Sequence, residues 1–186
     1  TFEREKQVGF SHNIFLYSIK MIAKSGSGIT DLNSLKGKTI ATTAGTTADR
    51  ILSGKKGEIG FNLIQTKDHS DGFLTVKQGR SVAFVMDEPL LYGQRAALSA
   101  DEAKGYEVVG PNLQFENYAC MLRHDDPAFT KVVDTVIAKM EKSGEMEKLY
   151  NKWFMEPVPP KNQNMHYPMT AEMRAMFKDP ITKAYD

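Results

Sequence analysis

Residues 40–50 read Ile40-Ala41-Thr42-Thr43-Ala44-Gly45-Thr46-Thr47-Ala48-Asp49-Arg50, and this stretch decides the fold. A short β-rich run from Lys38 to Thr43 follows the turn Lys36-Gly37, and residues 46–52 have the spacing of a first helical turn. The stretch therefore predicts a strand, a bend of small residues and a helix.

The predicted bend has the geometry of an anion-binding site. The free N–H groups at the start of a helix point out of such a bend, and Gly45 permits close approach of a ligand. Thr43, Thr46 and Thr47 add hydroxyl groups for a carboxylate or phosphate. A simpler alternative is that Thr46 only caps the helix, because threonine is a common N-cap residue. Neither GxxxxGK[ST] nor GxGxxG is present, which disfavours a nucleotide site.

Composition places the chain among globular proteins. Its 186 residues are 41% hydrophobic with a formal charge of +1, enough for one large core or two small ones and without the basic excess of nucleic-acid-binding proteins. No run has the apolar length of a membrane span, and Thr1 to Arg4 is charged, so we expect any export signal to have been removed or to lie outside this sequence.

Cysteine and histidine usage says little about chemistry. The single Cys120 leaves the redox compartment open, since a disulfide partner could lie on sequence beyond this chain. The four histidines are far apart in sequence, and the chain contains neither an HExxH nor a CxxC motif, so we expect no bound metal. They are His12, His69, His124 and His166.

Strands and helices are predicted to alternate through the first two thirds of the chain. A long strand, or two in succession, is expected over 14–23, and a short capped helix over 30–35. The alternation predicts a doubly wound, mostly parallel α/β layer, in which ligand groups collect at the carboxyl ends of strands. After the bend, the predicted elements are helix 47–56, strand 59–65, helix 71–78, strand 81–86, helix 89–98 and strand 106–109.

Polar side chains follow three of these predicted strands. Thr43 ends the first, residues 66–69 follow the second, and Asp87 follows the third. Because the carboxyl ends of parallel strands share one edge of a sheet, these residues are predicted to face a single crevice. This convergence favours a binding function.

The last third of the chain has a different pattern. A strand is predicted over 117–122, followed by apolar residues at helical spacing from Phe129 to Met140 and a second helix over 145–154. The stripe formed by Met146, Leu149, Tyr150 and Trp153 is predicted to be core. The proline-containing tail is predicted to be an extended strap with one amphipathic turn over 170–177.

The order of motifs along the whole chain resembles the periplasmic amino-acid-binding proteins of ABC importers, solute-binding protein family 3, and most of all their glutamate/aspartate-binding branch. The resemblance implies a periplasmic-binding-protein type II fold, in which two α/β lobes joined by two hinge strands close on one amino acid. The motifs are Glu3-Arg4, Val8-Gly9-Phe10-Ser11, residues 31–38, Gly45-Thr46-Thr47, Lys67-Asp68-His69, residues 82–87, Gly144-Glu145-Met146, Lys152-Trp153-Phe154 and residues 159–162.

The resemblance also implies a ligand site without catalytic residues, metal or cofactor. Arg4 would hold the ligand's α-carboxylate with a bidentate fork, Asp87 would accept from the α-ammonium, and His69 would face the ligand side chain. The alternatives are a solvated turn residue for Arg4, a helix N-cap for Asp87 and a loop residue or cap for His69. The assigned residues are Arg4, Thr43, Gly45, Thr46, Thr47, His69 and Asp87.

By the same resemblance, residues 1–13 are the first hinge segment and a remnant of lobe 1, and 14–115 are a complete lobe 2. Residues 116–156 supply the second hinge strand and the C-terminal helices of lobe 1, and 157–186 the strap. Members of the family begin with a further half-lobe, so we expect a truncated form for which binding alone is not assured. Its lobe 1 helices would expose an apolar face suited to a homo-oligomer, such as a domain-swapped dimer.

The predicted function is to bind glutamate or aspartate in the periplasm and deliver it to the membrane permease of an ABC importer. One alternative is an enzyme on the same fold, similar to cyclohexadienyl dehydratase. Asp87 and Glu88 diverge from adjacent positions, which is poor geometry for an acid/base pair. Another alternative is the ligand-sensing domain of a receptor, although no flanking transmembrane or coiled-coil segment supports it.

Overall fold

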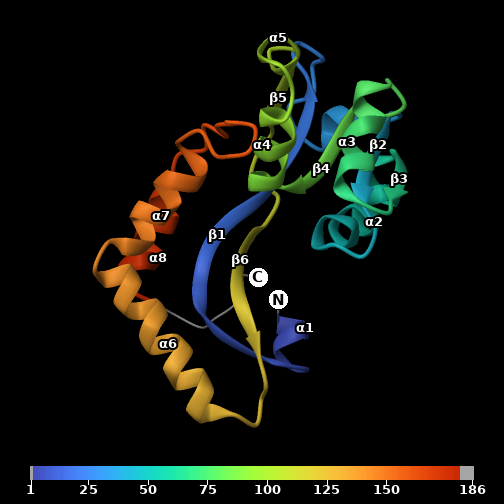
Figure 1. Cartoon of the computed structure of the whole chain (residues 1–186). Helices are drawn as coiled ribbons and strands as arrows, with labels where there is room; N and C mark the ends of the chain where they lie inside the picture. Colours follow the sequence, from blue (N-terminus) through green and yellow to red (C-terminus); the bar gives the residue numbers. More distant parts are fainter. Residues whose placement is uncertain (1, 181–186) are drawn as a thin grey trace. The chain divides into compact units, whose positions relative to one another are not determined.

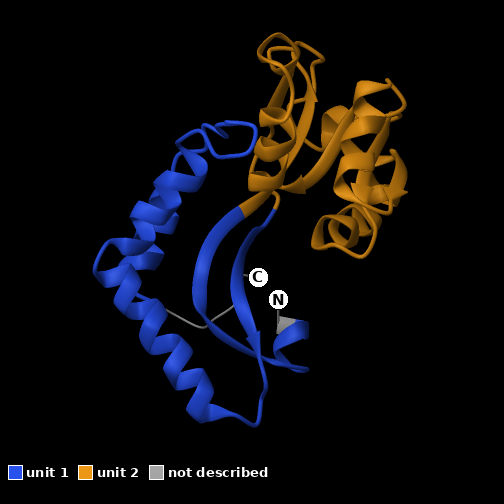
Figure 2. Ribbon diagram, in the orientation of Figure 1, with its two compact units in different colours: residues 1–17, 114–186 blue, residues 18–113 orange. Residues whose placement is uncertain are grey.

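A computed structural model describes residues 2–180 of the chain, which form two compact units. Unit 1 comprises residues 1–17 and 114–186, and unit 2 comprises residues 18–113 (Figure 2). The predicted limits of the central lobe were 14 and 115. No loop marks the first boundary, because β1 (Gly9–Lys24) is one continuous strand that begins in unit 1 and ends in unit 2 (Figure 1).

The sheet of unit 2 has the strand order β3-β2-β4-β1-β5. β2 (Thr39–Thr43) is parallel to both β3 (Asn62–Thr66) and β4 (Ala83–Asp87), as predicted. β1 is antiparallel to β4 and to β5 (Tyr106–Val109), so it runs against the other four strands. The prediction of a mostly parallel layer was correct except for β1, which enters from unit 1 and not through a strand–helix crossover.

Both faces of this sheet are buried. Consecutive residues of a strand point to opposite faces, so Met21 and Ile22 on β1 belong to two different cores. The helices α2 (Thr47–Ile59) and α3 (His69–Lys77) complete them: Leu52 of α2 packs in the first core and Phe73 of α3 in the second. The helix α4 (Glu88–Ala96) adds Leu91 to the second core.

Several predicted element boundaries in unit 2 were wrong. Ile59 ends α2 and does not begin a strand, because the helix continues to a left-handed C-cap at Gly60 with φ 82°. α3 begins at His69, two residues earlier than predicted, because Asp68 caps it. The expected helix over 30–35 is only the short 3-10 helix η1 (Asn33–Leu35), and the short α5 (Ala100–Ala103) was not predicted.

Unit 1 contains α1 (Phe2–Glu5), the first part of β1, its partner strand β6 (Phe115–Leu122) and three further helices. These are α6 (Pro127–Lys142), α7 (Glu145–Phe154) and α8 (Ala171–Lys178). Arg4, for which a solvated turn residue was the alternative, lies on α1. Within the predicted strap, α8 buries Met173 and Met176, while residues 181–186 lie outside the described residues.

The aromatic side chains of unit 1 form a cluster around α7. Tyr150 is 4% exposed, stacks on Phe154 with ring centroids 4.6 Å apart, and donates its hydroxyl to the Tyr167 carbonyl at 3.0 Å. The prediction that the helical stripe is core is correct for Tyr150. It is wrong for Leu149 and Trp153, since the latter is 49% exposed.

Large exposed hydrophobic side chains concentrate in unit 1. In the part of the chain that the structure describes, all of them except Leu74 belong to this unit. No helix within residues 2–180 is both long enough and apolar enough to cross a membrane. The unit 1 exposed apolar residues are Tyr118, Met121, Phe129, Val132, Val136, Leu149, Trp153 and Met155.

Candidate ligand-binding site

The carboxyl ends of three parallel strands meet at one edge of the unit 2 sheet. Thr43, the last residue of β2, is in register with Thr66, the last residue of β3. On the other side of β2, Thr42 is in register with Val85, two residues before the end of β4 at Asp87. The predicted convergence of Thr43, residues 66–69 and Asp87 at one edge is therefore present.

Three helices begin at the same edge. α2 starts after Thr46, α3 after Asp68 and α4 after Asp87. α4 follows β4 directly, and the other two helices begin within a few residues of the end of the preceding strand. The first N–H groups of a helix have no acceptor within that helix, and the helix dipole adds partial positive charge there. This edge therefore suits a ligand with negatively charged or hydrogen-bond-accepting groups.

The bend between β2 and α2 is organised by its own side chains. Gly45 has φ 74°, a left-handed conformation that glycine adopts without strain, and its N–H donates to Asp49 Oδ2 at 2.9 Å. The Thr46 hydroxyl donates to the Thr43 carbonyl at 2.7 Å and accepts from the Asp49 N–H at 3.2 Å. The simpler alternative is thus correct for the Thr46 hydroxyl, which caps the helix.

Asp49 organises the candidate site although it was not among the predicted residues. Its carboxylate accepts from the Gly45 N–H and, at 2.6 Å, from the side-chain amide of Gln65 on β3. The Gly45 N–H is therefore already bonded within the bend. The N–H of Thr47 remains as the first helical donor of α2. An acid in the first turn of a predicted helix can be recognised in the sequence. The bond between Asp49 and Gln65 cannot, because it depends on the pairing of β2 with β3.

His69 and Thr43 are joined by a hydrogen bond. The Thr43 hydroxyl oxygen lies 2.9 Å from His69 Nδ1, although the two residues are 26 positions apart. Thr43 is 5% exposed, whereas His69 is half-buried at the first position of α3. The structure therefore brings these two predicted site residues into contact.

Two adjacent carboxylates stand at the start of α4. Asp87 is 7% exposed and occupies the N-cap position, as its alternative had it, but its side chain accepts no capping hydrogen bond. Glu88 accepts from the Ser18 hydroxyl at 3.0 Å and lies 3.4 Å from Lys20 Nζ. Partial burial, reinforced by the charge of Glu88, raises the pKa of Tyr92 on the same helix.

Arg4 is the one predicted site residue that belongs to unit 1. It lies on α1, its side chain is exposed, and its carbonyl accepts from the N–H groups of Gln7 and Val8. The other six predicted residues all belong to unit 2.

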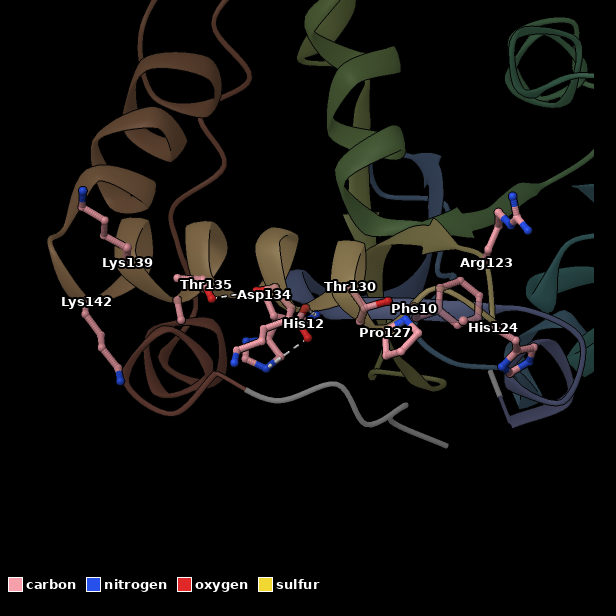
Figure 3. Close-up of a pocket in the computed structure, with 13 residues that line it drawn as sticks. Phe10, His12, Arg123, His124, Pro127, Thr130, Asp134, Thr135, Lys139 and Lys142 are labelled. Atoms are coloured by element: carbon pink, nitrogen blue, oxygen red, sulfur yellow. Dashed lines mark hydrogen bonds and ion pairs between the residues drawn. The ribbon is translucent and has the colours of Figure 1, made fainter.

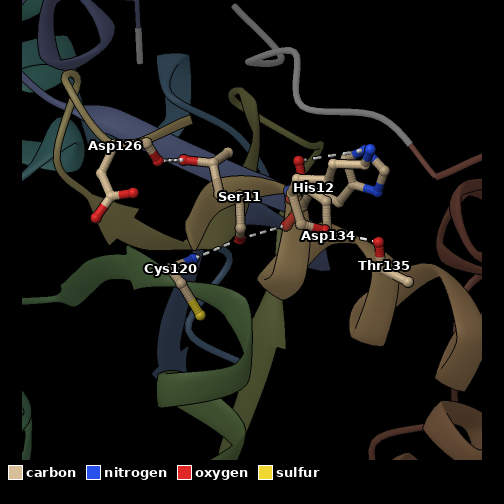
Figure 4. A network of polar contacts seen from close by, with 8 residues as sticks. Ser11, His12, Cys120, Asp126, Asp134 and Thr135 are labelled. Atoms are coloured by element: carbon tan, nitrogen blue, oxygen red, sulfur yellow. Dashed lines mark hydrogen bonds and ion pairs between the residues drawn. The ribbon is translucent and has the colours of Figure 1, made fainter. Parts of the chain in front are cut away.

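Unit 1 has an open groove of about 800 Å³ between β1, the end of β6 and α6 (Figure 3). His12 on β1 contacts Asp134 on α6. The backbone N–H of His12 donates to Asp134 Oδ1 at 2.7 Å, and the ring Nε2 of His12 lies 3.8 Å from Asp134 Oδ2. Next to this contact, the Ser11 hydroxyl accepts from the Cys120 N–H at 2.9 Å (Figure 4). These contacts hold β6 and α6 to β1, and we assign them a structural role.

In the described part of the chain, the side chains that could bind a metal are dispersed. Within residues 2–180, no three His, Cys, Asp or Glu side chains lie close enough together to hold a metal ion. The thiol of Cys120 is free and exposed in this structure.

Comparison with known proteins identifies the family. Residues 1–156 match the family described as bacterial extracellular solute-binding proteins, family 3. The chain belongs to this family.

Two relatives are glutamate- and aspartate-binding proteins. The chain is 44% identical to the glutamate/aspartate import solute-binding protein of Escherichia coli strain K12 over 184 residues, which are 98% of this chain and 60% of the relative. It is 43% identical to the L-glutamate/L-aspartate-binding protein of Pseudomonas aeruginosa over the same share of each. The chain thus spans 60% of the length of these relatives.

A solved structure gives the same result for the fold. The GluR0 ligand-binding core from Nostoc punctiforme, in complex with L-glutamate, superposes with a TM-score of 0.69 and 30% identity, covering 83% of this chain and 68% of that one. The predicted α/β fold of the periplasmic-binding-protein type II class is confirmed.

Proposed function

We propose that this family 3 chain takes part in binding a free amino acid, glutamate or aspartate, in the periplasm. The bound amino acid is then delivered to the membrane permease of an ABC importer. The observation that carries the proposal is the shared edge of unit 2, where three strand ends and three helix starts place Thr43, His69 and Asp87 together. The identity to two glutamate/aspartate-binding relatives supports this choice of ligand.

The chemistry of the edge fits an amino acid. The α-carboxylate would accept from the N–H groups of the N-cap residue Thr46 and of Thr47, the first residue of α2, where the helix dipole is also favourable. The α-ammonium would donate to Asp87, whose buried carboxylate is not used for capping. His69 would face the ligand's side chain. In this proposal Arg4 supplies a bidentate contact to the α-carboxylate, which a guanidinium makes better than an ammonium.

An enzyme on the same fold has less support. Acid/base elimination needs a carboxylate poised without a cationic partner, together with a second acid or base. Glu88, the second carboxylate beside Asp87, is bonded to Ser18 and lies 3.4 Å from the Lys20 ammonium. The named relatives are binding proteins, and the proposal follows them.

The test is calorimetry on a chimera that supplies the length the chain does not span. In this chimera the 186 residues replace the matched region of the Escherichia coli relative, and the binding of L-glutamate, L-aspartate, L-glutamine and L-arginine is measured. We expect glutamate and aspartate to bind most tightly. Preference for arginine, or no binding of any amino acid by a folded chimera, would refute the proposal.

A histidine substitution tests the ligand's side chain separately. A neutral imidazole donates one N–H to a carboxylate and a protonated one adds a charge, so His69→Ala should weaken glutamate binding much more than glutamine binding. His124→Ala, in unit 1, is the matched control and should leave the glutamate-to-glutamine ratio unchanged. An unchanged ratio in the His69 variant would remove this residue from the selectivity site.

A further inference from the structure

The Thr43 hydroxyl has a single partner in the described part of the chain, and this partner is the Nδ1 atom of His69 at 2.9 Å. Thr43 is 5% exposed at the end of the central strand β2, so water has little access to its hydroxyl. A buried hydroxyl proton without an acceptor costs about 1–3 kcal/mol. The geometry therefore favours the arrangement in which the O–H donates and Nδ1 accepts.

This direction of the hydrogen bond selects one form of the imidazole ring. In a neutral histidine one ring nitrogen carries the hydrogen and the other accepts. If Nδ1 accepts from Thr43, the hydrogen must be on Nε2. The opposite form, with hydrogen on Nδ1, would donate to the Thr43 oxygen and leave the buried O–H without an acceptor.

The backbone on both sides of His69 is also held. Asp68 caps α3 by accepting from the Asp71 N–H at 2.9 Å, and the Thr66 hydroxyl donates to the Asp68 carbonyl at 2.8 Å. The Ala44 N–H donates to the Thr66 carbonyl at 3.0 Å, which ties this loop to the bend after Thr43. The ring is therefore attached to β2 through its own Nδ1 and through the chain that carries it.

We propose that Thr43 is a positioning residue that fixes the His69 ring with hydrogen on Nε2, so that His69 offers a single N–H donor to the ligand. Its effect on ligand choice rests on the proposed function. An N–H donor pairs with a side chain that accepts: a carboxylate most strongly, because the bond is then charge-assisted, and an amide oxygen less strongly. It gives no partner to an ammonium or guanidinium, which only donate. Thr43 thus contributes to the choice of acidic side chains over amide and basic ones without touching the ligand's side chain.

The direct test needs no ligand and uses the 186-residue chain. Long-range proton–nitrogen NMR of ¹⁵N-histidine-labelled protein reports which ring nitrogen is protonated, and His69→Gln assigns the signal. We expect well-separated His69 resonances, with Nε2 protonated. Thr43→Val should bring the two nitrogen resonances closer together, and Thr43→Ser should restore their separation. Thr42→Val is the matched control, because it removes a buried hydroxyl on the same strand that donates to the Val85 carbonyl and not to His69.

Two results of the NMR experiment would overturn the proposal. One is hydrogen on Nδ1 of His69 in the parent chain, and the other is an unchanged separation in Thr43→Val. Either result is independent of which ligand binds.

A second arm measures selectivity in the chimera described above. Relative to Thr42→Val, we expect Thr43→Val to lower the ratio of glutamate to glutamine affinity about tenfold, which corresponds to roughly 1.4 kcal/mol, and Thr43→Ser to recover it. An unchanged ratio would overturn the contribution of Thr43 to selectivity. If the NMR signals change as expected but the chimera binds no amino acid, the proposed function fails while the positioning of His69 by Thr43 stands.

Discussion

Asp87 combines burial with a carboxylate that makes no capping hydrogen bond to its own helix. In the chimera, we expect Asp87→Asn to weaken amino-acid binding by more than tenfold, because the α-ammonium loses its counter-charge where truncating one partner costs about 2–5 kcal/mol. Asp101→Asn, an exposed acid on α5, is the control. Calorimetry should show parent-like affinity for the control, and parent-like affinity for Asp87→Asn would exclude this residue from the site.

Glu141 on α6 is a second buried acid, and it makes the stability of the chain depend on pH. It is 5% exposed, both carboxylate oxygens lack a partner within the described residues, and burial raises its pKa from 4.5 to about 7. The unfolded chain loses this proton at lower pH than the folded chain. The contribution of Glu141 to stability is therefore complete below about pH 4.5 and declines as the pH rises to about 7.

Replacing this acid by its neutral isostere should remove that dependence. We expect Glu141→Gln to raise the thermal midpoint at pH 8 and to change it little at pH 4.5, as followed by circular dichroism. Glu172→Gln, on the exposed side of α8, serves as the control. The explanation is wrong if parent and Glu141→Gln lose stability equally between these two pH values.

Much of the candidate site could be predicted from single residues and their neighbours. The strand–bend–helix signal around Gly45 and the polar residues after three strands were enough to place Thr43, His69 and Asp87 at one edge of the sheet. The bond from the Gly45 N–H to Asp49 and the one between Thr43 and His69 could not be predicted. Both depend on side-chain directions after the strands have paired, and spacing along the chain does not specify these.

The helix α3 lies close against the sheet at Gly72. A Cβ atom at Gly72 would lie 2.2 Å from a ring carbon of Phe84, and Phe84 is fully buried on β4. Gly72→Ala should therefore destabilise unit 2 by about 1–3 kcal/mol through overpacking, despite the better helix propensity of alanine.

A second helical glycine provides the matched control for this substitution. A Cβ atom at Gly54 on α2 would meet nothing within 4 Å, so Gly54→Ala should stabilise the helix by about 0.5–1 kcal/mol. Urea unfolding of both variants measures the difference. Equal midpoints for the two would show that the α3–β4 contact is looser than this structure has it.

The elements were predicted better than their directions. Apolar runs and turn residues identified the strands and most helices, because these signals are local. The direction of β1 relative to β4 was not predictable in this way, since one strand reads alike in a parallel or an antiparallel pair. The capped four-residue α5 was missed because it lacks an apolar periodicity of useful length.

The two units differ in their buried polar atoms without hydrogen-bond partners and in their exposed apolar side chains. Within residues 2–180, the buried polar side-chain atoms without a partner belong to His12, Glu116 and Glu141, all in unit 1. Unit 1 also holds the exposed apolar residues named above, including Phe129 and Val136 on α6. Apolar surface of this kind is typical of a surface that another polypeptide covers.

We therefore predict that the isolated chain self-associates through unit 1. Light scattering should show a mass that rises with concentration above that of a 20.8 kDa monomer. Phe129→Glu with Val136→Glu should shift it towards the monomer, whereas Leu74→Glu, at the exposed apolar residue of unit 2, should not. A monomer at all concentrations that binds no hydrophobic dye would contradict the prediction.

The continuity of unit 2 along the chain has a consequence for synthesis on the ribosome. Unit 2 is one uninterrupted stretch, and its two ends meet: the Leu113 N–H donates to the Ile19 carbonyl at 3.0 Å. All five of its strands are therefore synthesised before α6, α7 and α8. Unit 1 must wait for the last helix, because it is assembled from both ends of the chain. Unit 2 can therefore fold while unit 1 is still incomplete. During translation, chaperones and proteases then meet the unfolded segments of unit 1 and not those of unit 2.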